Sequence, residues 1–103
     1  MVLQRIANES ADGRVATTRI QALQQKKAAE LNDSDAQNNL ASMFLQGQGV
    51  VRDVEQAMHW YQRASDSGHV IAPYQLGMLY ETRGIAEGSH DTAMYWYQIA
   101  AQR

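Results

Sequence analysis

Hydrophobic residues recur along the chain at helical spacing. Between residues 34 and 46, Ala36, Leu40, Met43 and Phe44 stand at i, i+4, i+7 and i+8, which places them on one stripe of an α-helix. A second stripe consists of Val54, Ala57, Met58, Trp60, Tyr61 and Ala64. The Gly-Gln-Gly segment 47–49 lies between the two stripes, and we expect it to turn through backbone conformations with positive φ. The pattern therefore predicts a two-helix unit over residues 34–69.

The same pattern returns after 36 residues without a gap, so that Trp60-Tyr61 aligns with Trp96-Tyr97. The aligned positions that we expect to carry the repeat are Leu40, Phe44, Gly47, Gly49, Asp53, Ala57, Trp60 and Tyr61, followed by Leu76, Gly77, Tyr80, Ala93, Trp96 and Tyr97. Coincidence is a poor explanation because tryptophan is rare. Units of this length bury their apolar faces by stacking. We predict an all-α fold, an α-solenoid of antiparallel helix pairs, with repeats at 34–69 and 70–103.

Local signals set the expected helix ends. Ser34 followed by Gln37 is typical of a capping box at the start of the first helix, and Asp53 followed by Gln56 has the same form at the second. Gly68 is placed to end the second helix at its C′ position.

Three further residues fit the second unit. Pro73 falls in the first turn of its helix, where the missing N–H does little harm. Gly77 aligns with Ala41, and glycine costs about 1 kcal/mol of helix propensity relative to alanine. We therefore expect these small residues to let neighbouring helices approach closely.

The N-terminal third is less regular. Val15, Ile20, Leu23 and Leu31 predict a helix from about residue 14 to residue 31, read as the second helix of a degenerate preceding repeat. Residues 14–33 would then cap one end of the solenoid. Residues 1–13 are expected to form a tail or a short helix.

The repeat resembles a known family, the Sel-one-like repeats, which are relatives of the tetratricopeptide repeats. The residues that carry the resemblance are Ala36, Leu40, Phe44, Gly47, Gly49, Val50, Asp53, Ala57, Trp60, Tyr61 and Ala64, then Ala72, Leu76, Gly77, Tyr80, Ala93, Trp96, Tyr97, Ala100 and Ala101. The resemblance covers about residues 28–103. It implies a right-handed superhelix that acts as an adaptor, often in bacterial signalling or envelope assembly, with no substrate or cofactor.

The second unit departs from the family pattern in its loop. Arg83, Ile85 and Ala86 stand where Gly, Gly and Val are expected, and Ser89 replaces the aspartate. We expect the loop to follow another path there, with Ser89 or Asp91 capping the next helix.

Composition and charge narrow the function. The chain of 103 residues is 45% hydrophobic and carries a formal net charge of −2. These values exclude a disordered chain and disfavour a nucleic-acid partner, which would require a basic surface. There is no cysteine, no run of membrane-spanning length, and no apolar signal-peptide core between Met1 and Asp12. We expect a cytoplasmic protein without membrane insertion, or a periplasmic one if a signal peptide has been removed.

Candidate chemistry is sparse. The histidines His59, His69 and His90 do not combine into a metal-binding spacing, so we expect no metal, no cofactor and no enzyme activity. One alternative is a small enzyme or metal-binding protein that uses the loop around His90-Asp91. Another is that the tryptophans and tyrosines form a cage or a stacking platform. Their helical spacing favours a structural role in the core instead.

Binding of a protein or peptide is the expected function. The first helices of stacked repeats line the concave surface of a solenoid. A helical wheel places on this side Asn38, Ser42, Leu45, Tyr74, Met78 and Glu81. The alternative is that the N-terminal helix folds over these residues. Because the chain stops directly after its last repeat helix, we also expect a homo-oligomer through the C-terminal helix pair, unless the chain is a fragment of a longer repeat protein.

Overall fold

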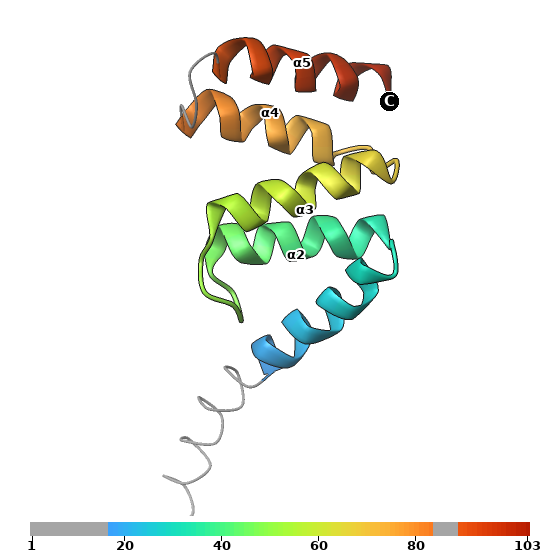
Figure 1. Ribbon diagram of the computed structural model, residues 1–103, viewed down its shortest axis with the longest axis vertical. Coiled ribbons are helices and arrows are strands. Elements are labelled where there is room, and N and C mark those ends of the chain that lie inside the picture. The colour runs from blue at the N-terminus through green and yellow to red at the C-terminus, as the bar shows by residue number, and fades with distance from the viewer. Residues whose placement is uncertain (1–16, 84–88) are drawn as a thin grey trace, which may run out of the picture.

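The computed structural model describes residues 17–83 and 89–103. Residues 17–30 are helical, and four further helices follow: α2 (Ser34–Gln46), α3 (Val54–Asp66), α4 (Ala72–Arg83) and α5 (Ser89–Gln102). No strand occurs within these described ranges. Helix α2 packs on α3, α3 on α4, and α4 on α5, which gives a stack of antiparallel pairs (Figure 1). The predicted all-α solenoid of antiparallel helix pairs is confirmed.

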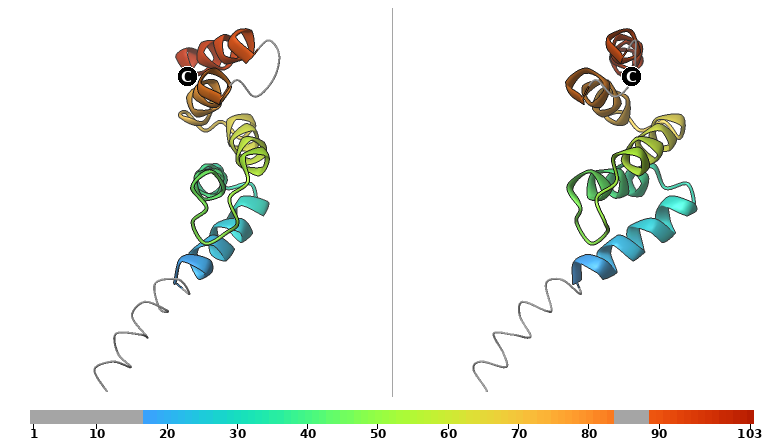
Figure 2. Two further views of the ribbon diagram at one scale, coloured as in Figure 1. Left: turned by 90° about the vertical axis from the view of Figure 1, so that its left-hand side faces the viewer. Right: turned by 60° about the vertical axis from the view of Figure 1, so that its left-hand side comes forward.

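The described helices stack in a row (Figure 1). Figure 2 shows from two further sides that the helices follow one another in chain order along the molecule. Each helix is therefore stabilised mainly by its sequence neighbours, as expected of a repeat protein. The predicted tail 1–13 and the loop residues 84–88 lie outside the described residues.

The core runs through the middle of the stack and is formed by the repeat positions. Its buried members are Ala29, Ala36, Leu40, Ala41, Ala57, Trp60, Tyr61, Leu76, Leu79 and Trp96. Phe44 and Tyr80 are half-buried and pack against it. Leu40 and Leu76 are each 1% exposed, so the leucine at this repeat position is the central apolar contact of both pairs.

Aspartates cap the two helices of the first repeat. Asp33 accepts a hydrogen bond from the backbone N–H of Ala36, at 3.1 Å, and is the N-cap of α2. The prediction of a capping box starting at Ser34 was therefore wrong by one residue. The side chain of Gln37 instead donates to the carbonyl of Ala29, at 3.0 Å, and ties α2 to the preceding helix. Asp53 is the N-cap of α3, as predicted.

Glycines end the helices as the sequence indicates. Gly47 and Gly49 have φ values of 71° and 74°, in the left-handed region. Gly68, with φ of 92°, follows α3 and donates its N–H to the carbonyl of Ser65, while His69 donates to Ala64. This pair of hydrogen bonds is a Schellman motif. Pro73 lies in the first turn of α4 and is buried.

The helix over residues 17–30 buries a different face from the one predicted. Ile20, Leu23 and Leu31 are 53%, 63% and 82% exposed, whereas Ala22 and Ala29 are buried. Small residues make this contact because the helix approaches α2 and the 47–49 turn closely. A Cβ atom at Gly49 would overlap the carbonyl oxygen of Thr18.

Candidate protein-binding surface

Each repeat packs one tyrosine of its second helix across its first helix, but the two tyrosines find different partners. In the first repeat, Tyr61 is 2% exposed and shares a hydrogen bond of 2.8 Å with the hydroxyl of Ser42. Burial raises the pKa of Tyr61, while the hydrogen bond with Ser42 acts in the opposite direction. Tyr61 is therefore a core residue whose hydroxyl is hydrogen-bonded. Its partner is the Ser42 hydroxyl, which the sequence pattern assigns to the binding of another protein.

In the second repeat, the tyrosine at the equivalent position lies partly at the surface. Tyr97 is half-buried, and its ring covers Gly77, where an added Cβ would come within 2.6 Å of its Cε1 atom. Its hydroxyl donates to the carboxylate of Glu81, at 2.5 Å, and its ring centroid lies 5.7 Å from that of Tyr74. The hydrogen bond to Glu81 raises the pKa of Tyr97 to about 12. Tyr97 thus differs from the fully buried residue that the sequence predicts.

These residues border an open groove between α4 and α5 with a volume of about 640 Å³. Its lining consists of Val70, Ile71, Tyr74, Glu81, Tyr97, Ala100 and Ala101. Val70, Ile71 and Tyr74 are 59%, 55% and 50% exposed, which is unusual for large apolar side chains on one wall. Among the described residues, the hydroxyl of Tyr97 is the partner of the Glu81 carboxylate, and no ion pair forms there. The groove is apolar with one acidic end.

The six residues predicted to bind a partner divide by repeat. Those of the second repeat are open, since Tyr74 and Met78 are 50% and 40% exposed and Glu81 is exposed. Those of the first repeat, Asn38, Ser42 and Leu45, are all half-buried. Leu45 packs against the core and is therefore less accessible than Tyr74 and Met78. The accessible part of the predicted face is therefore on α4.

His69, considered above only as a possible metal ligand, lies at the junction between the repeats. Its Nδ1 atom accepts hydrogen bonds from the backbone N–H groups of Ile71 and Ala72, at 3.3 and 3.1 Å. Because Nδ1 accepts, the ring proton lies on Nε2, 3.3 Å from Asp35 Oδ1. His69 stands 36 residues after Asp33 and caps α4 at the same position as Asp33 caps α2. The repeat alignment was the signal that would have found it.

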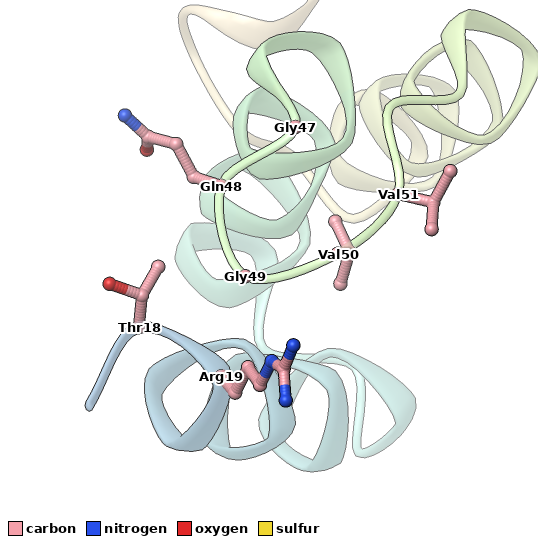
Figure 3. A pocket seen from close by; sticks show the side chains of 7 residues that line it. All are labelled: Thr18, Arg19, Gly47, Gln48, Gly49, Val50 and Val51. Carbon is pink, nitrogen blue, oxygen red and sulfur yellow. The ribbon is translucent and has the colours of Figure 1, made fainter. Parts of the chain in front are cut away.

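A second hollow, of about 590 Å³, lies where helix 17–30 approaches the turn after α2 (Figure 3). It is lined by Thr18 and Arg19 and by residues 47–51. In Figure 3 the side chain of Gln48 points away from helix 17–30, while that of Arg19 lies along this helix. Val51 is 88% exposed at its edge. Arg19 is the one charged side chain among the seven lining residues.

The histidines do not converge. His59 is exposed, and its ring meets the edge of Trp60 at 5.3 Å between centroids. His90 and Asp91 are both exposed at the start of α5. Within residues 17–83 and 89–103, no three His, Cys, Asp or Glu side chains gather where they could hold a metal ion. Across the same ranges, no helix combines the length and apolarity required to span a membrane.

Comparison with known proteins identifies the repeat. A sequence model described as "Sel1 repeat" matches residues 34–69 and 71–103. The chain belongs to the Sel1 repeat family. Repeats of the Sel1 family form helical solenoids and generally mediate protein–protein interaction. The resemblance seen in the Trp-Tyr and Gly-x-Gly positions is thereby confirmed.

Two curated Sel1 repeat relatives come from fission yeast, Schizosaccharomyces pombe. Chitin synthase regulatory factor 2 is 33% identical over 78 residues, which cover 74% of this chain and 15% of that protein. Chitin synthase regulatory factor 4 is 34% identical over 76 residues, which cover 73% of this chain and 11% of that protein. The chain thus spans a small part of the length of these relatives.

Proposed function

We propose that this Sel1 repeat chain is a non-catalytic adaptor that binds a peptide or protein through the face formed by α2 and α4. The observation that carries the proposal is the exposure of Tyr74 and Met78 side by side on α4. These positions lie one helical turn apart, so their side chains form one continuous apolar surface. Tyrosine is enriched among the residues that dominate binding energy at protein interfaces.

The family supports the same conclusion. Sel1 repeats generally mediate protein contacts, and the two relatives are named as regulatory factors. A regulatory role for this chain, exerted by holding another protein, is consistent with both names. The acidic Glu81 at the edge of the face favours a partner segment that carries a basic residue.

A photo-crosslinking amino acid placed at residue 78 tests the proposal. It should capture one dominant partner, identified by mass spectrometry, whereas the same probe at Tyr95 should not. Tyr95 is a matched control because it is 57% exposed and stands two residues from Tyr97, on the opposite side of α5. Capture of the same proteins at both positions would refute binding through this face.

The purified partner then allows a quantitative comparison. Replacing Tyr74 by alanine should weaken binding by about 2 kcal/mol, which is about thirty-fold in Kd, if this tyrosine is a central contact. Tyr95→Ala should leave Kd within about two-fold. An equal loss in both variants would argue against a specific role for Tyr74.

A further inference from the structure

The ring of His69 holds the first turn of α4 with a nitrogen that can bind a proton. Its Nδ1 atom accepts hydrogen bonds from the backbone N–H groups of Ile71 and Ala72, at 3.3 and 3.1 Å. The equivalent cap of the first repeat is made by Asp33, whose carboxylate accepts the N–H of Ala36 at 3.1 Å. Histidine side chains ordinarily titrate at about pH 6.5 and aspartates at about pH 3.9. The two caps therefore respond to different ranges of pH.

Proton uptake removes the acceptor from this cap. A neutral imidazole has one nitrogen that accepts and one that donates, whereas both nitrogens of an imidazolium carry N–H groups. A proton on Nδ1 of His69 would face the N–H groups of Ile71 and Ala72, which would then have no acceptor. The positive charge would also lie at the N-terminal end of α4, where the helix dipole disfavours a cation. The charged ring therefore cannot serve as the cap.

The charged groups around the ring compensate only in part. Nε2 lies 3.3 Å from Oδ1 of Asp35 on α2, but this side chain is 87% exposed, and exposed ion pairs contribute little to stability. From the end of α5, the guanidinium of Arg103 donates to the carbonyl of His69 at 2.9 Å and adds positive charge to the junction. On α3, Arg63 is hydrogen-bonded to a residue before α2, and Asp66 is exposed. Loss of the cap therefore outweighs the gain at Asp35.

The position of this cap connects it to the contact between the repeats. His69 follows the end of α3, where its backbone N–H donates to the carbonyl of Ala64 at 2.9 Å. Ala72, whose N–H the ring holds, is fully buried, and α4 packs on α3. The side chain of His69 is 12% exposed, so the ring is in contact with solvent and can exchange a proton with it. Release of the cap thus frees the first turn of α4 where the two repeats meet.

We propose that protonation of His69 releases the first turn of α4 and loosens the junction between the two repeats. The cap stabilises the junction while the ring is neutral, and this contribution is lost as the pH falls through the range, around about pH 6.5, in which histidines titrate. The second repeat thereby has a response to mild acid that the first repeat, capped by Asp33, does not share. The proposal does not depend on the adaptor function.

Amide exchange of the whole chain, followed residue by residue by NMR at about pH 7.5 and about pH 5, tests the proposal. After correction for the intrinsic effect of pH on exchange, the protection of the Ala72 amide should fall about five-fold at the lower pH, which corresponds to the loss of a typical N-cap. The protection of Ala36, held by Asp33, should stay the same and is the internal control. The ¹⁵N shifts of the His69 ring should change over the same range, from a ring with an accepting Nδ1 to an imidazolium.

Two substitutions separate the cap from the ion pair. Asparagine is as good an N-cap as aspartate and does not titrate, so His69→Asn should keep Ala72 protected at both pH values. Asp35→Asn removes the carboxylate that favours the charged ring, and the fall in protection should then be at least as large as in the wild type. His59 and His90 are unchanged in both variants, so any effect of their titration is common to all three chains. Circular dichroism at both pH values confirms that each chain is folded.

Three results would overturn the proposal. The first is equal protection of Ala72 at both pH values, whether the ring of His69 is charged or neutral at the lower one. The second is protection that rises at the lower pH and no longer does so in Asp35→Asn, because the ion pair would then hold the charged ring in place. The third is an equal fall in the wild type and His69→Asn, which would assign the effect to another group.

Discussion

Adding one methyl group at Gly77 tests how the last helix pair is packed. Alanine is favoured over glycine in a helix interior by about 1 kcal/mol, so the change should stabilise α4 if nothing lay above it. An added Cβ would lie 2.6 and 2.7 Å from Cε1 and Cδ1 of Tyr97 and 3.2 Å from the carbonyl oxygen of Ala93. Overpacking of this kind costs about 1–3 kcal/mol. The difference predicts that Gly77→Ala lowers the free energy of unfolding by about 0–2 kcal/mol.

The effect of Gly77→Ala on stability should change sign when the ring of Tyr97 is removed. In a Tyr97→Ala background, Gly77→Ala should raise the free energy of unfolding by up to about 1 kcal/mol, the propensity gain reduced by the remaining contact with the carbonyl oxygen of Ala93. Urea unfolding followed by far-ultraviolet circular dichroism measures all four chains of this double-mutant cycle. An equal effect of Gly77→Ala in both backgrounds would refute the packing argument.

A second readout comes from the displaced ring. When the new methyl group pushes Tyr97 aside, its hydroxyl loses Glu81, and its pKa should fall from about 12 toward the ordinary value. In the first repeat, Ala41 stands at the glycine position and Tyr61 bonds Ser42 instead. Adding Met78→Ser to Gly77→Ala copies that arrangement and should recover part of the lost stability.

Three more changes have expected outcomes. The raised pKa of Tyr97 means that the neutral phenol is favoured in the folded chain. This stabilisation is complete below pH 10 and disappears as the pH rises through about 12. An absorbance titration of the Glu81→Gln variant should show a lower pKa for Tyr97. His69→Ala should cost about 1 kcal/mol in urea unfolding, because α4 loses its cap, whereas His69→Asp should retain most of it. Gly49→Ala should cost about 1–2 kcal/mol for its left-handed backbone, and amide exchange should quicken in residues 17–30, since the methyl group meets Thr18.

The repeat could be predicted from the sequence because its signals are local and redundant. The Trp-Tyr pairs at one offset and the glycines at 47 and 49 each specify burial or a backbone conformation at a fixed place. Tertiary context changes such positions little, since a tryptophan on the apolar stripe of any stacked helix pair is covered. Trp60 and Trp96 are 7% and 9% exposed, which shows how alike the two environments are.

The features that escaped prediction depend on neighbours in space. Tyr61 and Tyr97 are identical in the sequence pattern, yet Tyr61 is buried beside Ser42 whereas Tyr97 is half-buried beside Glu81. Asp33 and Ser34 are both good caps, so only the entry angle of the chain decides between them. Histidine is an uncommon cap, which hides the role of His69 from a search for Ser, Thr, Asp and Asn.

The junction at His69 also has a mechanical meaning. Its backbone N–H closes the end of α3, its ring holds the start of α4 and approaches Asp35, and its carbonyl accepts a hydrogen bond from Arg103 at 2.9 Å. His69 thus makes hydrogen bonds to both repeats. Because contacts in a solenoid are made between neighbours, bending of the whole molecule is concentrated at such joints. The contacts of His69, together with the packing of α3 on α4, therefore help to fix the angle between the two repeats.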